Sequence, residues 1–267
     1  MAAAGGLLAA SLVPAVGAAR GRKSEVVFEP DPQNAPSAIY GALDAVACKA
    51  ELRQRKVVFT EEPPSPGVMA PVRIPEGVGG VVYRTALPRA QGKTSPWEVF
   101  DCRLVLALYD FSAILREHGI DEAEIFSAWR PPPKTWPADK EGRRHPGGLA
   151  VDIGRFGLEE PPPAAPAEKP AEKPAEKPAE KPAKKPPKKR WLNVKKDFHG
   201  RIGDKSCGKG ARGPRQKTPE AQVLRALYCE AADARIFTSM LSPNYDRPHH
   251  NHFHLEVTPG VKWRLIR

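Results

Sequence analysis

The sequence predicts a domain that mixes helices and strands, and three observations support that prediction. Residues 95–115 carry apolar side chains at helical spacing, between Ser95, a residue type favoured at helix starts, and Gly119, a type favoured just beyond helix ends. Three segments alternate like strands, namely 123–129, 148–154 and 252–257, and shorter strand-like pieces occur at 71–74 and 81–84. A further helix is expected to begin at Thr218. With 267 residues, the chain is long enough for one substantial core.

The N-terminal part of the chain is expected to lie outside this domain. Residues 1–19 contain no charged side chain and are rich in Ala, Leu, Val and Gly, which is typical of a secretory signal, although the usual basic start is missing. Residues 20–36 are polar and read as a disordered lead-in, and one helix is expected from Ser37 through Leu52. The protein is therefore expected to be exported, to the periplasm or outside the cell, with no membrane-spanning segment in the mature chain.

Residues 159–190 read as a low-complexity insertion. Ala-Glu-Lys-Pro is repeated four times between Ala167 and Pro182, and proline at every fourth position forbids a stable helix. An extended, solvated spacer is expected here. Because residues 191–194 read as a strand again, the spacer is expected to interrupt a hairpin inside one domain, 37–258, followed by a C-terminal tail, 259–267.

Basic residues cluster at the end of this insertion. The chain has a net charge of +11, and five of its positive charges lie within residues 184–190. Such a cluster suggests a polyanionic partner, such as an acidic cell-wall polymer or an anionic membrane surface, and the alternative is a solvated linker end. No aromatic residues alternate with these lysines and no nucleic-acid-binding motif is visible, so specific nucleic-acid recognition is not expected. A monomer is expected.

The four cysteines fit an exported protein with two disulfides. Of the three possible connectivities, Cys48 with Cys102 and Cys207 with Cys229 is favoured, because each bond then joins neighbouring segments without crossing the rest. Free buried thiols are the alternative. No two cysteines have CxxC spacing, so a structural zinc site with four cysteine ligands is not expected.

Four of the seven histidines lie between positions 249 and 254. If residues 252–257 form a strand, His252, His254 and Glu256 share one face, and the apolar residues between them face the core. The alternative is a histidine-rich surface tract that binds metal weakly or not at all.

Two further residues of metal-ligand type lie upstream. His145 is placed in a turn before a strand, and Asp152 lies on the polar face of that strand. Together with His254 they would form a three-ligand zinc site with an open fourth position, which is the arrangement that catalytic zinc requires.

These motifs together resemble a known group of proteins. The pattern His-x-x-Gly-x-Ala-x-Asp, from His145 to Asp152, and the later His-x-His pair are similar to the metallopeptidase superfamily of D-alanyl-D-alanine carboxypeptidases, lysostaphin-type endopeptidases and the hedgehog signalling domain. Phe126 to Pro131 and residues 249–256 make the resemblance closer to the bacterial extensin-like C-terminal domain family, over about residues 40–258.

The resemblance implies an α+β fold, of the hedgehog and D,D-peptidase type, in which a small antiparallel sheet with flanking helices carries a metal on one face. It implies Zn²⁺ held by His145, Asp152 and His254, with His252 assisting the metal-bound water. Arg130 occupies the place of an arginine that contacts substrate or the developing oxyanion. Carboxypeptidase relatives use a glutamate for the role that is expected of His252, and this chain has none at an equivalent place.

The function implied by the resemblance is that of an exported zinc peptidase or amidase that hydrolyses peptide bonds of peptidoglycan. The alternative is a zinc-containing module that binds or supports the cell wall without hydrolysis. Glu256 is expected to contact a metal-bound histidine from behind. The remaining histidines are expected to be structural or surface residues: His118, His199, His249 and His250.

Overall fold

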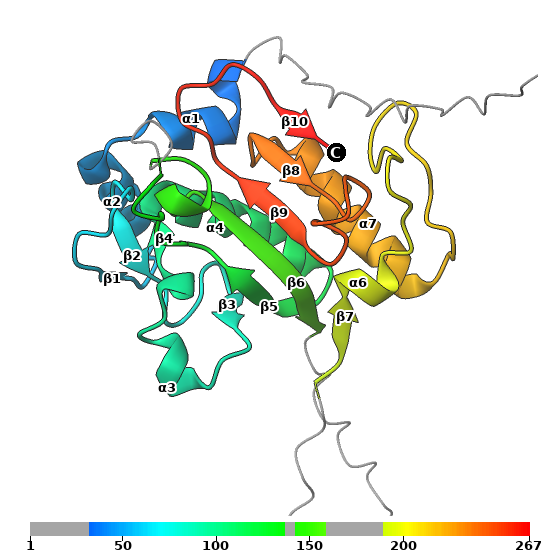
Figure 1. Ribbon diagram of the computed structural model, residues 1–267, viewed down its shortest axis with the longest axis horizontal. Helices are drawn as coiled ribbons and strands as arrows, with labels where there is room; N and C mark the ends of the chain where they lie inside the picture. The colour runs from blue at the N-terminus through cyan, green and yellow to red at the C-terminus, as the bar shows by residue number, and fades with distance from the viewer. Residues whose placement is uncertain (1–31, 137–141, 159–188) are drawn as a thin grey trace, which may run out of the picture.

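The computed structural model describes residues 32–136, 142–158 and 189–267. The predicted signal segment 1–19, most of the lead-in 20–36 and almost all of the insertion 159–190 lie outside the described residues. The described part is a mixed α/β structure with two sheets (Figure 1).

The larger sheet has seven strands within the described residues, in the order β10-β8-β9-β6-β5-β3, with β7 paired to β6. Its strands are β3 (Val82–Thr85), β5 (Ile120–Ser127), β6 (Ala150–Leu158), β7 (Trp191–Asn193), β8 (Ser239–Leu241), β9 (Phe253–Glu256) and β10 (Leu265–Ile266). The centre is antiparallel, but β3 runs parallel to β5 and β10 runs parallel to β8. The predicted small antiparallel sheet is therefore a larger, mixed sheet, because each of its two edge strands pairs in parallel with its neighbour.

A smaller antiparallel sheet has three strands within the described residues, in the order β1-β2-β4. Its strands are β1 (Thr60–Glu61), β2 (Pro71–Arg73) and β4 (Phe100–Asp101). The strand-like pieces predicted at 71–74 and 81–84 correspond to β2 and β3.

Two of the predicted helices differ from the helices that the described residues form. The described helices are α1 (Pro36–Ala42), α2 (Ala45–Gln54), α3 (Arg89–Gly92), α4 (Cys102–Glu117), α6 (Val194–Asp197), α7 (Pro219–Asp233) and the short 3₁₀ turns η1 (Pro32–Asn34), η2 (Pro96–Glu98) and η3 (His145–Gly147). The single helix predicted from Ser37 is divided into α1 and α2, because Asp44 is extended and its carboxylate caps α2 at the Ala47 amide, 2.8 Å away.

The long central helix α4 begins later than predicted. Ser95 caps only η2, and the chain then forms β4 before α4 begins at Cys102. The true N-cap is Asp101, whose carboxylate accepts from the Arg103 amide at 3.0 Å. The predicted stop is confirmed, since Gly119 has a φ of 69° just after the helix. The start at Thr218 is also confirmed, because its hydroxyl caps α7 at the Ala221 amide.

The core lies between the large sheet and the two long helices α4 and α7, which cover one face of it (Figure 1). The Phe253 ring of β9 is 5.2 Å from the Tyr228 ring of α7, and the Phe156 ring of β6 is 6.5 Å from the Phe111 ring of α4. The opposite face of β6 and β9 is therefore left for polar side chains.

Two disulfides reinforce this arrangement, as predicted: Cys48–Cys102 joins α2 to α4, and Cys207–Cys229 joins a long loop to α7. The insertion begins and ends at adjacent strands, because β7 pairs with β6 and the Leu158 amide donates to the Arg190 carbonyl at 2.9 Å. Residues 259–267, expected to be a tail, contribute β10 to the sheet. Among the described residues, no helix has both the length and the apolar character needed to cross a membrane.

Candidate metal site

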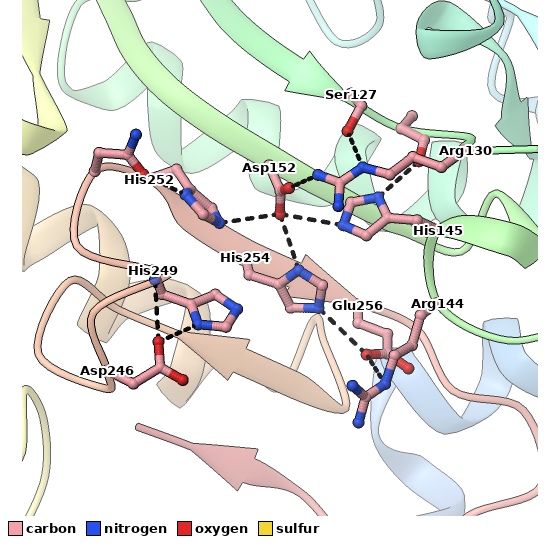
Figure 2. Close-up of polar contacts among 12 residues, drawn as sticks. Ser127, Arg130, Arg144, His145, Asp152, Asp246, His249, His252, His254 and Glu256 are labelled. Atoms are coloured by element: carbon pink, nitrogen blue, oxygen red, sulfur yellow. Dashed lines mark hydrogen bonds and ion pairs between the residues drawn. The ribbon is translucent and has the colours of Figure 1, made fainter.

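The site lies on the face of β6 and β9 that is turned away from α4 and α7 (Figure 2). Asp152 of β6 stands directly opposite His254 of β9 in the antiparallel register. The neighbours Phe253 and Leu255 are fully buried in the core, so the predicted division of this strand into an apolar and a polar face is confirmed.

Three side chains converge on one point. Asp152 Oδ1 lies 3.2 Å from His145 Nε2 and 2.9 Å from His254 Nδ1, and all three side chains are buried. Ligands held at 2.0–2.1 Å in a tetrahedral shell are roughly 3.3 Å apart. One nitrogen or oxygen from each of the three residues lies within 4.8 Å of the others, so this cluster could hold a metal ion.

The outer nitrogen of each histidine has a partner that orients the ring. His145 Nδ1 donates to the Ala128 carbonyl at 2.7 Å, which leaves Nε2 to face Asp152. His254 Nε2 lies 3.4 Å from Glu256 Oε2, which leaves Nδ1 to face Asp152. Glu256 therefore occupies the supporting position predicted for it, and such partners are typical of metal-bound histidines.

A strained turn delivers His145 to this point. Arg144, just before η3, has φ 49° and ψ −138°, a conformation that is costly for a residue with a side chain. Gly148, just after η3, has φ 64°, and a Cβ there would lie 2.9 Å from the Asp101 amide nitrogen. The Arg130 amide donates to the His145 carbonyl at 3.1 Å and ties this turn to the end of β5.

The cluster is tightly coupled electrostatically. Burial alone would raise the pKa of Asp152, but hydrogen bonds from His145, His252 and His254 hold that pKa well below its usual value. Burial alone would lower the pKa of His254, but Asp152 and Glu256 outweigh it and raise that pKa to about 9. The pKa of Glu256 is lowered, because its contact with His254 outweighs the effect of burial. The raised pKa favours the charged form of His254, which lies between the carboxylates of Asp152 and Glu256.

His252 lies beside the cluster rather than in it. Its Nε2 is 3.3 Å from Asp152 Oδ1, and its Nδ1 is 2.8 Å from Asn251 Oδ1. Among the described residues, the set whose ligand atoms are all mutually close contains His145, Asp152 and His254, without His252. His252 therefore lies next to the three residues that could hold a metal ion.

Arg130 is directed at Asp152. Its guanidinium bonds to Asp152 Oδ2, and its Nε donates to the Ser127 hydroxyl at 2.8 Å. About half of the side chain is exposed. Arg130 therefore holds the second oxygen of Asp152 and presents its outer edge to solvent.

An exposed aromatic ring borders the site because of two irregularities in strand pairing. In β6, Gly154 has no partner in β5, because residues 124 and 125 of β5 pair with residues 155 and 153 of β6. In β5, Phe126 has no partner in β6, because residue 127 pairs with residue 152. The Phe126 ring lies over Gly154, where a Cβ would come within 2.5 Å of it. This ring is 42% exposed and makes an edge contact with His252 at 5.6 Å.

His249 belongs to the neighbourhood of the site and was missed by sequence reasoning. Its ring centroid lies 5.2 Å from that of His252 and 5.7 Å from that of His254, and its Nδ1 is 2.6 Å from Asp246 Oδ1. Burial is the main cause of its lowered pKa. The Asp-x-x-His spacing from Asp246 to His249 was the available signal, since a turn brings residues three apart together. His118 and His250 remain at the periphery, bonded to Glu230 and to the Arg247 carbonyl.

The fold and the cluster thus define a mixed α/β domain with a candidate metal site. Residues 210–267 match a family model described as "Extensin-like protein C-terminus". The chain is similar to that family over this segment, which contains His252, His254 and Glu256, whereas His145 and Asp152 lie outside it. A search of curated proteins found no match. A search of solved structures found none either.

Proposed function

We propose that this protein is an exported zinc-dependent peptidase or amidase that hydrolyses peptide bonds of peptidoglycan, with the D,D-peptidase or hedgehog type of zinc fold. The observation that carries the proposal is the convergence of His145, Asp152 and His254 beside a further histidine and an arginine. Three protein ligands next to a proton carrier are typical of catalytic rather than structural zinc.

The donor set supports zinc in particular. Two imidazole nitrogens and one carboxylate oxygen suit Zn²⁺, whereas Ca²⁺ and Mg²⁺ prefer oxygen ligands throughout. Each histidine has a partner at its second ring nitrogen that fixes its tautomer: the Ala128 carbonyl for His145 and the Glu256 carboxylate for His254. When bound at such a site, zinc supplies Lewis acidity, which activates water and polarises a carbonyl.

The surrounding side chains have distinct roles in this proposal. His252 takes a proton from the attacking water and returns one to the leaving amine, because it is the histidine next to the ligands that is not itself a ligand. Arg130 fixes Asp152 and offers its exposed edge to negative charge that develops on the substrate. His249, held by Asp246, supports the His252 ring.

The substrate class rests on several features of the chain. The N-terminal segment is typical of a secretory signal, the two disulfides suit an oxidising compartment, and the basic residues at 184–190 suit an anionic wall polymer. Under the same proposal, the protein is located in the periplasm or outside the cell and acts on the wall as a monomer.

Digestion of purified peptidoglycan tests the proposed activity. Full-length protein, loaded with zinc, is incubated with the wall, and the released muropeptides are identified by mass spectrometry. We expect new peptide ends that disappear with EDTA and return with added zinc. His252→Ala should reduce product formation by about 100-fold or more, as expected for a general acid-base residue. His250→Ala is the matched control, because His250 is exposed and its ring bonds to the Arg247 carbonyl rather than to the cluster.

A zinc-containing module without hydrolysis is the second candidate, and the position of Arg130 favours it, since that guanidinium is bonded to Asp152 rather than free. Elemental analysis separates the outcomes. One zinc per chain without any metal-dependent product on several wall types would establish the second candidate and exclude the first. A zinc content well below one half per chain after zinc-replete purification would contradict both.

A further inference from the structure

A long irregular segment, residues 198–218, connects α6 to α7 and is called the basic loop below. All of it is described, and it contains no helix or strand. Irregular connections longer than about 12–15 residues are uncommon inside domains and are usually either functional or disordered. Figure 1 shows the basic loop, largely in yellow, at the right edge of the molecule beyond α7. The three residues of the metal cluster come from other segments of the chain.

The basic loop is fixed to the rest of the domain near its middle. Cys207 is joined to Cys229 of α7 by a disulfide. The neighbouring Ser206 is buried, and its hydroxyl lies 2.7 Å from the hydroxyl of Ser242, which follows β8. These attachments argue against a disordered linker and favour a loop whose shape serves a function.

The basic loop also folds back on itself, so that two limbs lie side by side. The Arg215 amide donates to the His199 carbonyl at 2.7 Å, and the Arg212 amide donates to the Lys205 carbonyl at 2.9 Å. The first limb therefore runs from His199 to Lys205, and the second runs from Arg212 to Arg215. Arg225 of α7 supports the second limb, because its Nη1 donates to the Arg212 carbonyl at 3.0 Å.

The charge that these limbs carry is almost entirely positive. Six side chains of the basic loop are Lys or Arg, and one is acidic, Asp204. Asp204 lies 3.6 Å from Arg212, whose side chain is 75% exposed. The other basic side chains have no ion pair with any described residue, and all except Lys205 are exposed: Arg201, Lys205, Lys209, Arg215 and Lys217. Like charges that are held close together repel, and an anionic partner would relieve that repulsion.

We propose that the basic loop binds a linear polymer whose repeats carry phosphate groups, and that Arg201 of the first limb and Arg212 and Arg215 of the second contact it. The planar guanidinium of arginine matches a phosphate group with two parallel hydrogen bonds. Cations on two adjacent limbs suit a partner that carries many charges along its length better than a single small anion. The inference depends on neither the metal site nor the proposed hydrolysis.

The apolar side chains of the basic loop favour such a polymer over nucleic acid or a membrane. Single-stranded nucleic acids bind partly by stacking their bases on aromatic rings. The one phenyl ring of the loop, Phe198, is 1% exposed and lies 4.1 Å from the Arg225 guanidinium. Membrane-surface segments combine cations with several apolar side chains that enter the lipid. The loop has a single exposed large hydrophobic residue, Ile202.

Binding of fluorescein-labelled short-chain polyphosphate to the full-length protein tests the inference, by fluorescence anisotropy with EDTA present. We expect binding that weakens as salt is added, because exposed charges are screened. The double variant Arg201→Glu/Arg215→Glu changes one exposed arginine on each limb and should weaken binding by about 10-fold or more, because attraction is replaced by repulsion. Its unfolding temperature should not fall below that of the parent, because both side chains are exposed.

Two control variants locate the binding surface. Arg89→Glu/Lys93→Glu makes the same change of charge at exposed residues in and next to α3, at the lower left of Figure 1, and should change the affinity by less than about twofold. Lys184→Gln/Lys185→Gln/Lys188→Gln neutralises the basic end of the insertion and should keep the affinity within about threefold of the parent.

Several outcomes would overturn the inference. They are equal weakening in the loop and α3 variants, loss of binding in the insertion variant but not in the loop variant, and no binding of polyphosphate at about 1 mM phosphate. Tighter binding to single-stranded DNA of equal charge would assign the loop to nucleic acid instead. Tighter binding to vesicles of equimolar phosphatidylglycerol and phosphatidylcholine would assign it to a membrane surface.

Discussion

The two faces of the central strands β6 and β9 are equally buried but are stabilised by different means. On one face Val151, Ile153 and Phe253 pack against the helices, and their exposed fractions are all 0%. On the other face Asp152 and His254 have exposed fractions of only 3% and 5%, and each is surrounded by charge-bearing partners. Apolar burial is stabilising at any spot with good packing, whereas polar burial is tolerated only where every group has a partner. Substitutions on the apolar face should therefore lower the stability of the fold, whereas substitutions on the polar face should weaken metal binding.

Removing a large ring from the apolar face should have the largest effect. Phe253→Ala leaves a cavity among Phe156, Phe198 and Tyr228 and should lower the free energy of unfolding by about 3–5 kcal/mol. Zinc content of the folded fraction should stay near one per chain. Urea denaturation in EDTA, with Val46→Ala at a position 79% exposed as the control, measures the first effect. A loss below about 1 kcal/mol would show that this face is not the one that stabilises the fold.

A nearly isosteric change on the polar face should instead abolish metal binding. Asp152→Asn keeps the shape but removes the negative charge that faces His145, His254 and Arg130. Zinc affinity should fall by at least about 100-fold, measured by competition with a chromogenic chelator, because a ligand oxygen and its charge are both lost. Asp246→Asn is the control, because the Asp246 carboxylate bonds to His249 rather than to the three clustered residues. Equal zinc affinity in the Asp152 variant and the parent would contradict the metal site.

A supporting residue on the polar face should have an intermediate effect. Glu256→Gln weakens the orientation of His254 without touching the cluster directly, so zinc affinity should fall by about 10-fold. Glu230→Gln, beside the peripheral His118, should leave the affinity unchanged. The prediction fails if both variants bind zinc like the parent protein.

The smallest expected effect is the pH dependence of the metal-free protein. The pKa of His254 is raised from 6.5 to about 9, so its stabilisation is complete below pH 6.5 and is lost as the pH rises through about 9. The difference in unfolding free energy between the parent and His254→Gln, both in EDTA, should therefore shrink by about 1–3 kcal/mol between roughly pH 6 and pH 10. His250→Gln should show no such trend. A difference that grows with pH would mean that His254 is neutral in the folded protein.

Much of the site could be predicted because it follows local rules. Alternation over residues 252–257 placed His252 and His254 opposite Phe253, and the preference for bonds that join neighbouring segments without crossing favoured the disulfide pairs that were found. The start of α4 could not be predicted in the same way. Ser95 and Pro96 form a good helix start, but pairing of β4 with β2 delays the helix until Asp101. Long-range strand pairing overrode the local signal.

The sequence by itself determined which residues are chemically suited to a metal and which strand faces they occupy, because side-chain type and alternation are local properties. Only the tertiary structure decided that Asp152 and His254 are cross-strand neighbours, that Arg130 bonds to Asp152, and that His249 joins the group. Register, bulges and turn strain set those distances, and they depend on the packing of segments that are far apart in the chain.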